Sequence, residues 1–357
     1  MSNIKNNIEI KALYENKDRY LSSPSITRLA PDKSLLLYHD APFRNPAVKF
    51  DLKSSLGIMA APSPDQPDLK TKRIVPRFKD SGSAPSAVKL TESKAFLTDN
   101  RYIVFNWMGE PEVPVMPFYD WVMLLRGGYG MVIDASGEKL RFGKPRRITS
   151  HHYPAVSCYD ESIALNENTI LCPVDYDSNC MRLQDRPWET IIMRTDDLGL
   201  TWRRHGAIHL EIDGSDIPRL HHPAVRRLPD GRMVCMLHSN DAEPIFYFCE
   251  SEDGGENWTG VKSLGFVGSQ HSLIVLADGR LMMTYSPLKE PYGVKYRISE
   301  DGGRTWPESS VVFIDDSSES EDCGHARGLL LDDGSVYIVY YTHKGKYRLI
   351  MGARVEV

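Results

Sequence analysis

The sequence predicts an all-β fold, a six-bladed β-propeller with four antiparallel strands in each blade. Two interleaved repeats support this prediction. In the first, an Asp, a Gly and a Trp recur at fixed spacing in residues 195–202, 251–258 and 299–306, and the Asp positions are 56 and 48 residues apart. In the second, an Asp-Gly pair separates two apolar runs. Repeating units of about 50–60 residues that contain four strands are typical of propeller blades.

The first repeat has the chemistry of a tight turn between two strands. Its Asp, for example Asp197, can accept hydrogen bonds from nearby backbone N–H groups, its Gly tolerates a positive φ, and its Ser or Thr hydroxyl closes the loop. The Trp that ends each copy is expected to pack between sheets. We call this turn the Asp box and place it between the third and fourth strands of a blade.

The second repeat predicts the hairpin between the first and second strands of each blade. Its turns are Asp230-Gly231, Asp278-Gly279 and Asp333-Gly334, and Asp-Gly between alternating apolar residues is a strong hairpin signal. Weaker copies place turns at residues 32–33 and 166–168. The six blades are then expected to begin near Ser23, Ala84, Tyr153, His222, Gln270 and His325.

The first and last strands of the chain are expected to close the ring. The apolar patterns at residues 8–13 and 347–357 can share one blade, which removes the exposed edges that an open array would have. We therefore expect residues 1–357 to form a single domain, with about 60 residues per blade. The segment 61–86 is rich in Pro, Ser and Lys, and we interpret it as a surface loop or insertion.

Composition excludes several other classes of protein. The chain has 43 Lys and Arg against 48 Asp and Glu, a net charge of −5, which gives no basic surface for nucleic acid. It has no apolar run long enough to span a membrane, and its first twenty residues are polar, unlike a secretory signal. The six cysteines form no CxxC pair, so we expect buried free thiols and a cytoplasmic protein.

The strand order gives the propeller two different ends. Asp-Gly hairpins and Asp boxes lie at one end, so the segments leading into each blade and the loops after the second strands lie at the other, which we call the mouth. Functional residues are usually carried on loops held by a rigid scaffold. Nine of the eleven histidines are expected at the mouth: His39, His151, His152, His221, His222, His238, His271, His325 and His343.

Four of these histidines, at positions 152, 222, 271 and 325, begin or immediately precede an innermost strand. A neutral imidazole can act as general base, general acid or metal ligand near pH 7. Carboxylates expected at the same end include Asp40 and Glu243. Candidate substrate-binding residues, which include cations and aromatic rings able to stack on sugars, are Arg44, His152, Tyr153, Asp175, Arg219, His238, His271, Tyr292, Lys295, Arg327 and Tyr341.

The three Asp boxes and the strings HSLIVLADGRLMMTY, PYGVKYRISEDGGRTW and EDCGHARGLLLDDGSVYIVYY resemble the sialidase (neuraminidase) superfamily of Asp-box, or BNR-repeat, propellers. The resemblance covers residues 190–357 well and residues 20–40 weakly. It implies a six-bladed propeller that binds a carbohydrate at the mouth. Sialidases use three arginines for the substrate carboxylate, a tyrosine nucleophile assisted by a glutamate, and an aspartate as acid and base.

The chain departs from the catalytic pattern that this resemblance implies. His222 stands where the glutamate is expected and His325 where the tyrosine is expected, while Asp40 is the nearest candidate for the aspartate. A tyrosine nucleophile is therefore not available at position 325, whereas proton abstraction or water activation by histidine is. On this resemblance we take His222 and His325 as candidate catalytic residues, with Asp40 or Glu243 as the carboxylate partner.

The arginines that the resemblance implies are also replaced. Ser22 takes the place of the first and His238 takes the place of the one on the second strand of blade 4. Lys295 takes the place of the blade 5 arginine, and Arg297 lies two residues further on. This loss argues against ordinary sialic acid as the substrate.

Three functions remain open. The first is a sialidase-like glycoside hydrolase with altered, histidine-based catalytic residues. The second is a polysaccharide lyase that removes the proton next to a uronate carboxylate, which Lys295, Arg327 or Arg219 would neutralise. The third is a non-catalytic propeller that binds a glycan or a protein. We expect no required cofactor, but the histidines leave a divalent metal open, and the oligomeric state is equally open.

Overall fold

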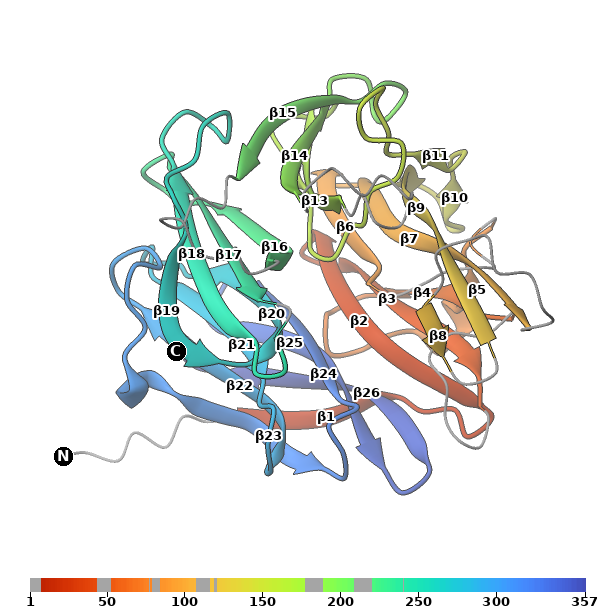
Figure 1. The fold of residues 1–357 in the computed structure, drawn as a ribbon. Coiled ribbons are helices and arrows are strands. Elements are labelled where there is room, and N and C mark those ends of the chain that lie inside the picture. The colour runs from red at the N-terminus through yellow and green to blue at the C-terminus, as the bar shows by residue number, and fades with distance from the viewer. Residues whose placement is uncertain are drawn as a thin grey trace.

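The computed structural model describes residues 8–43, 53–76, 78, 84–106, 116–118, 121–176, 189–208, 220–239 and 241–357. It is an all-β structure, and Figure 1 shows its sheets arranged around a common centre. Six sheets form six blades, and each is built around four antiparallel strands. The predicted six-bladed propeller is therefore confirmed.

The strands of each blade follow one another outward from the centre, and blade 6 takes its outermost strand from the start of the chain. Blade 1 contains β2 (Arg19–Ala30), β3 (Lys33–Pro42), β4 (Ser55–Ala61) and β5 (Arg73–Ile74). Blade 2 contains β6 (Ser86–Thr91), β7 (Lys94–Asn106), β9 (Trp121–Asp134) and β10 (Arg141–Phe142), while β8 (Met116–Phe118) and β11 (Arg146–Arg147) also pair with β9. Blade 3 contains β12 (Ile163–Ala164), β13 (Ile170–Tyr176), β14 (Glu189–Thr195) and β15 (Arg203–Ile208).

The second half of the ring is more regular. Blade 4 contains β16 (Leu220–Arg227), β17 (Met233–Ser239), β18 (Ile245–Ser251) and β19 (Lys262–Val267). Blade 5 contains β20 (Ser269–Val275), β21 (Leu281–Ser286), β22 (Tyr292–Ser299) and β23 (Val312–Ser318). Blade 6 contains β24 (Gly324–Leu330), β25 (Val336–Lys344), β26 (Tyr347–Val355) and β1 (Ile8–Tyr14).

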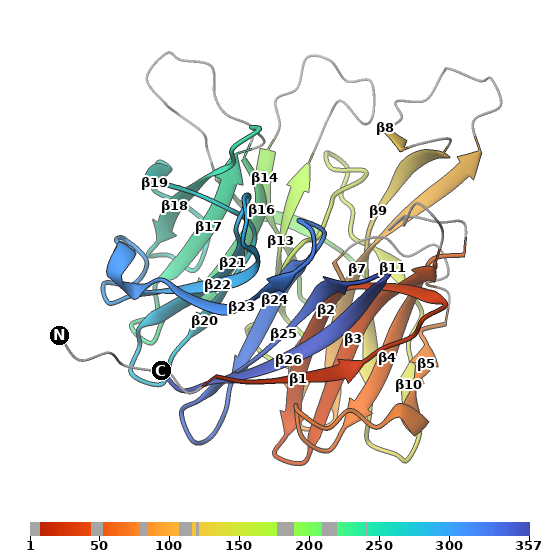
Figure 2. The same cartoon turned by 90° about the horizontal axis from the view of Figure 1, so that it is seen from below.

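The first strand of the chain completes the last blade. β1 pairs with β26 in antiparallel register, with Ile8 opposite Val355. Figures 1 and 2 show β1 lying alongside β26, at opposite ends of the colour scale. Backbone hydrogen bonds between the two strands therefore join blade 6 to the start of blade 1.

The segment 61–86 contributes to blade 1 rather than forming only a surface loop. β5 pairs with β4, with Gly57 opposite Ile74, and the short 3₁₀ helix η1 (Leu69–Thr71) precedes it. Val75 and Phe78 are fully buried. Polar composition obscured this strand because it has only two residues, both exposed.

The Asp boxes have the bonding that the sequence predicts. In blade 3, Asp197 accepts hydrogen bonds from the backbone N–H of Thr201 (2.9 Å) and from its hydroxyl (2.6 Å). The backbone N–H of Gly199, at φ +82°, donates to the hydroxyl of Thr195 (2.8 Å). Equivalent bonds recur at Asp253 and Asp301. Each box therefore fixes its turn locally, at the end of the ring opposite the mouth.

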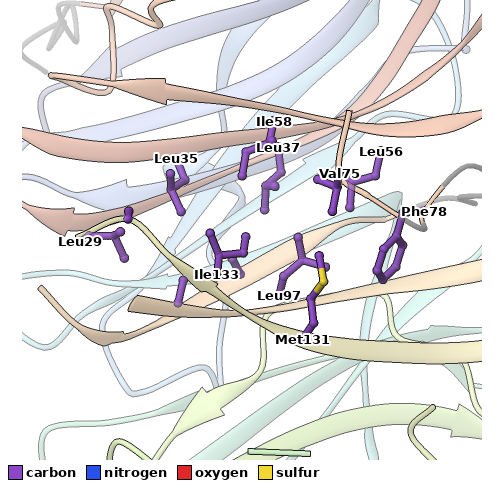
Figure 3. Packing of buried hydrophobic residues seen from close by; sticks show 13 residues of the cluster. Leu29, Leu35, Leu37, Leu56, Ile58, Val75, Phe78, Leu97, Met131 and Ile133 are labelled. Carbon is purple, nitrogen blue, oxygen red and sulfur yellow. The ribbon is translucent and has the colours of Figure 1, made fainter. Parts of the chain in front are cut away.

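Apolar side chains hold neighbouring blades together. Figure 3 shows Leu35, Leu37 and Ile58 of blade 1 facing Leu97 and Ile133 of blade 2. Five further clusters of buried residues in the described part of the chain lie at the other five interfaces between blades. Because alternate residues of a strand point to opposite faces, each blade packs against both neighbours and holds its innermost strand in place.

Helix is limited to short turns in the described ranges. The 3₁₀ helices η1 and η3 (Glu308–Ser310) have three residues each. No helix among the described residues is both long and apolar enough to cross a membrane.

Candidate functional site

The same backbone distortion occurs at the mouth in four blades. Ser23, His222, Gln270 and His325 each have a positive φ, between +46° and +56°. Each begins a two-residue bulge in the innermost strand of its blade, opposite a single residue of the second strand. A non-glycine residue in this left-handed region is strained, and such residues gather at active sites and ligand sites.

The bulge of blade 5 begins at the residue that the sequence places at the start of that blade. In blade 5 the bulge begins with Gln270, so this residue, and not His271, is the counterpart of His222 and His325. His271 is the next residue, and it is buried with its Nε2 3.0 Å from the carbonyl oxygen of Met236 in blade 4. It therefore bonds to the neighbouring blade.

Side chains of the preceding blades hold two of the bulges. The backbone N–H of His222 donates to Oδ2 of Asp175 in blade 3 (2.9 Å). The backbone N–H of His325 donates to Oε1 of Gln270 in blade 5 (2.9 Å). Asp175 is 2% exposed and also accepts from the hydroxyl of Thr190 (3.3 Å). The candidate residue Asp175 thus acts on the main chain of His222.

Four imidazoles lie together at the blade 4 bulge. The ring centroids of His222 and His238 are 4.7 Å apart, and those of His238 and His271 are 5.6 Å apart. His221 lies 6.2 Å from both His222 and His238. These separations show that β16, β17 and β20 bring the predicted histidines of blades 4 and 5 into one group, which we call the histidine cluster.

Burial keeps three members of the histidine cluster, His222, His238 and His271, neutral near pH 7. It lowers the pKa of His222 well below the usual imidazole range, and the neighbouring His238, His221, His271 and His325 lower it further. Burial also lowers the pKa of His238, and it lowers the pKa of His271 to about 3. His325 is among the groups that lower the pKa of His222, so the bulge residues of blades 4 and 6 are close enough for their charges to interact.

Tyr159 of the segment leading into blade 3 completes this surface. Its ring centroid lies 4.0 Å from that of His222, with 39° between the ring planes. Burial raises the pKa of Tyr159 well above its usual value, and its hydroxyl bonds to Ser157 and Tyr102. The hydroxyl is therefore protonated at neutral pH.

A second polar group adjoins His325. Its ring centroid lies 6.1 Å from that of Tyr341, whose hydroxyl donates to Asp322 (3.0 Å). Asp322 also accepts from the hydroxyl of Tyr20 (2.7 Å) and from Nη2 of Arg348 (2.6 Å). The Arg348 charge and these hydrogen bonds hold the pKa of Asp322 below its usual value despite burial. The candidate Tyr341 is thus held in place by Asp322, with its ring beside that of His325.

A buried ionic cluster lies at the centre of the ring. Asp160 is bonded to Arg226 (3.1 Å), to the hydroxyl of Ser272 (3.3 Å) and, at 3.7 Å, to Arg327. Arg226 also contacts Glu161 (3.3 Å). We call these five residues the central cluster, which joins the innermost strands of blades 4, 5 and 6 to the segment leading into blade 3.

The central cluster occupies Arg327, a predicted substrate-binding cation. Its Nη1 donates to the carbonyl of Pro85 (2.7 Å), its Nη2 donates to the carbonyl of Tyr159, and the residue is 4% exposed. Arg327 therefore holds the segments that lead into blades 2 and 3.

The two predicted carboxylate partners lie apart from the histidine cluster. Asp40 is buried and forms an ion pair with Arg19. Glu243 is 59% exposed and bonds to Lys289 at 2.5 Å. Neither carboxylate is bonded to a histidine in the contacts described for these residues.

The other predicted binding residues are spread over several blades. His152 is exposed and packs on His151. Tyr153 is buried, and its hydroxyl donates to Glu189 (2.8 Å). In blade 5, Tyr292 is half-buried at the start of β22, and the Lys295 ammonium lies 4.2 Å from the centre of the Phe313 ring. Arg44 and Arg219 lie outside the described residues.

A metal centre has no support from the described part of the chain. No group of three or more His, Cys, Asp or Glu side chains there is arranged to hold a metal ion. Nδ1 of His222 and Nε2 of His238 lie 3.0 Å apart, as in a hydrogen bond. These two nitrogens are therefore hydrogen-bonded to each other and do not point at a shared metal position.

Sequence reasoning missed three residues that shape the site. Tyr159 and Asp160 precede an innermost strand of only two residues, so no strand pattern marked their position. Gln270 stands at a predicted blade start, but its amide is a weaker sign of catalysis than the adjacent imidazole of His271. The common positive φ is the signal that groups it with His222 and His325.

Comparisons with known proteins agree with this architecture. The family described as a BNR repeat-like domain matches residues 125–338, more than half of the chain. No curated protein sequence matches this chain. The crystal structure of a protein of unknown function from Dyadobacter fermentans has a TM-score of 0.80 at 18% identity, over 98% of this chain and 99% of that one.

Two sialidases share the fold at lower similarity. Trypanosoma rangeli sialidase in complex with the inhibitor DANA has a TM-score of 0.59 at 15% identity, over 94% of this chain and 55% of that chain. NanB sialidase from Streptococcus pneumoniae has a TM-score of 0.61 at 11% identity, over 98% of this chain and 70% of that chain. This chain spans about half the length of the trypanosomal enzyme. With its three Asp boxes and six blades, the chain belongs to the BNR repeat-like domain family and is a sialidase-like propeller.

Proposed function

We propose that this chain is a glycan-processing enzyme, a glycoside hydrolase that uses His222 and His325 in place of the usual sialidase residues. One observation carries the proposal: both histidines are held in the strained left-handed conformation at the same position of their blades. Such a conformation costs on the order of 1–3 kcal/mol per residue. Because Asp175 and Gln270 of the preceding blades hold the two bulges by hydrogen bonds, the two imidazoles are attached to a fixed backbone.

The proposed reaction uses one imidazole as base and the other as acid. His222, kept neutral by burial, takes a proton from water as the water oxygen bonds to the anomeric carbon. The glycosidic bond breaks, and the leaving oxygen takes a proton from the imidazolium form of His325, which becomes neutral imidazole. Exchange with solvent then returns each imidazole to its starting state. Such a pair acts with inversion when the two groups are about 6.5–9.5 Å apart.

The substrate is expected to be a sugar other than ordinary sialic acid. The positions that the resemblance assigns to arginines hold Ser22, His238 and Lys295. Of these, Ser22 is buried and the Lys295 ammonium lies over the Phe313 ring. A sugar without a carboxylate needs no such cations, and aromatic walls and hydrogen bonds suffice to orient it.

A glycoside panel tests the proposal. We expect the purified chain to release sugar from at least one aryl glycoside or oligosaccharide, and His222→Ala to lower that rate by about 10²–10⁴-fold. His205→Ala is the matched control, because the His205 imidazole bonds to the Gly254 carbonyl in an Asp box, away from the mouth. No turnover across the panel, or equal rates in the two variants, would reject hydrolysis.

A polysaccharide lyase is the second candidate. It is favoured by the pairing of both candidate carboxylates with other residues, whereas a neutral imidazole and a protonated tyrosine hydroxyl lie side by side at His222 and Tyr159. In that reaction His222 takes the proton next to a uronate carboxylate, and a carbon–carbon double bond forms as the bond to the leaving sugar breaks. The leaving oxygen takes a proton from the Tyr159 hydroxyl, which regains one from solvent. Only this reaction yields an unsaturated product that absorbs in the ultraviolet. Uronate polymers therefore separate the two candidates.

A further inference from the structure

The two nitrogens of His238 have different partners. Its Nδ1 lies 2.8 Å from the carbonyl oxygen of Ser239. Its Nε2 lies 3.0 Å from Nδ1 of His222. The His238 ring is 6% exposed, so protein groups supply these partners.

The partners decide where the protons lie. A carbonyl oxygen only accepts, so the hydrogen shared with Ser239 must belong to Nδ1 of His238. A neutral imidazole carries one N–H, which leaves a lone pair on Nε2 of His238. That lone pair can only accept, so the hydrogen in the bond between the two histidines must belong to Nδ1 of His222. The lone pair of His222 is therefore on Nε2.

The surroundings of His222 restrict how its ring can turn. Asp175 holds its backbone N–H at 2.9 Å, within the strained bulge. The ring of Tyr159 covers one of its faces at a centroid distance of 4.0 Å. Its ring also meets His238 almost at a right angle, at 87°. With the backbone, one ring face and Nδ1 all engaged, Nε2 is the nitrogen left for a reacting group.

We infer that His238 is a positioning residue, which holds His222 in the tautomer protonated on Nδ1 so that Nε2 takes the proton in the reaction. This inference rests on the proposed role of His222 as a base. The proton from water goes to Nε2 of His222, and the hydrogen on Nδ1 stays in place. His238 accepts a stronger hydrogen bond from the resulting imidazolium and itself gains no proton.

The blade geometry explains why His238 can do this. His238 lies on β17 opposite His221, the residue just before the bulge. In blade 6 the equivalent position on β25 holds Tyr341, opposite Gly324 and next to the ring of His325. In both of these blades the fold thus places this residue of the second strand beside the bulge side chain.

Nuclear magnetic resonance of the imidazole nitrogens tests the tautomer without any substrate. In the full chain labelled with ¹⁵N, we expect His222 to carry its proton on Nδ1 at neutral pH. His238→Leu removes the acceptor, so His222 should shift toward the Nε2-protonated form that free imidazole prefers. A His222 protonated on Nε2 in the unaltered chain, or one that His238→Leu leaves unchanged, would overturn the inference.

Kinetics then separate positioning from a structural role. With a hydrolysed glycoside, His238→Leu should lower kcat by about 10–100-fold with KM unchanged, since it alters proton transfer and not binding. His238→Gln, whose amide oxygen can accept from Nδ1 of His222, should recover part of kcat, and the shorter His238→Asn should not. Equal kcat for the Gln and Asn variants, or a change in KM alone, would count against positioning.

These two readouts also keep this inference apart from the proposed function. If His238→Leu fails to fold, the Gln and Asn variants still give both measurements, because they keep a polar group at that position. His205→Gln is the control for a histidine replaced elsewhere in the ring. A chain with the inferred tautomer that hydrolyses no glycoside would refute the hydrolase while the tautomer assignment stands.

Discussion

Replacing Asp160 with Asn should destabilise the whole ring, because this one carboxylate serves two buried arginines. Its side chain is 2% exposed, and those of Arg226 and Arg327 are 13% and 5% exposed. Asn keeps the size but removes the charge. Arg226 retains its contact with Glu161, whereas Arg327 is left with carbonyl partners alone.

The expected loss can be worked from these contacts. Removing one partner of a buried ion pair costs about 3–5 kcal/mol. Unfolding entropy of about 2.1 cal/mol/K per residue, over 357 residues, gives about 0.75 kcal/mol/K. The Tm of Asp160→Asn should therefore fall by about 4–7 °C when unfolding occurs in one transition.

Thermal melts followed by circular dichroism at neutral pH measure this change. Glu243→Gln is the matched control, because it breaks a 2.5 Å ion pair with Lys289 in which both side chains are more than half exposed. That variant should melt with the unaltered chain, since exposed ion pairs contribute little. If Asp160→Asn melts within about 1 °C of the unaltered chain, the central cluster does not hold the blades together.

Three further perturbations test other parts of the structure. Burial lowers the pKa of His271 to about 3, so below about pH 6.5 the unfolded chain binds a proton that the folded chain does not. The free energy of unfolding should therefore decrease as the pH is lowered, by about 2 kcal/mol at pH 5 for this residue. Urea titrations at pH 7 and pH 5 should show a smaller drop for His271→Gln, and an equal drop in both proteins would contradict the burial argument. Asp322→Asn should lower the Tm, because the buried Arg348 loses its counter-charge, whereas Asp332→Asn, at a carboxylate that is 79% exposed and pairs with Arg28, should not; equal melts would refute this. Gly303→Ala should destabilise more than Gly334→Ala, since both have a positive φ but only the first new Cβ would meet a side chain, 2.7 Å from the Phe248 ring; denaturant midpoints give the comparison, and the reverse order would be evidence against it.

The fold was predictable because its signals are local. An Asp box is bonded within about seven residues, so Asp197, Thr195 and Thr201 reveal it without any distant contact. An Asp-Gly hairpin likewise fixes the pairing of its two strands, which brings His238 beside His221. The meeting of β1 with β26 followed from the need to complete the sixth blade.

The site was predictable only in outline because its decisive contacts cross between blades. The bond of Asp160 to Arg327 joins residues far apart in the chain, and nothing in the local pattern of either residue marks the other. Similarly, a bulge shifts the register by one residue, and this shift decides that Gln270 rather than His271 takes the place of His222. Apolar periodicity is too coarse to locate such a shift.

The four left-handed bulges carry a consequence for how this ring can change its chemistry. The same distortion accommodates a serine, two histidines and a glutamine, so the backbone sets the geometry and the side chain is free to vary. Each of these four blades therefore offers one such position, which we call a socket, at the bulge of its innermost strand. Exchanging the residue in a single socket would alter what the mouth recognises while leaving the strands, the Asp boxes and the contacts between blades as they are.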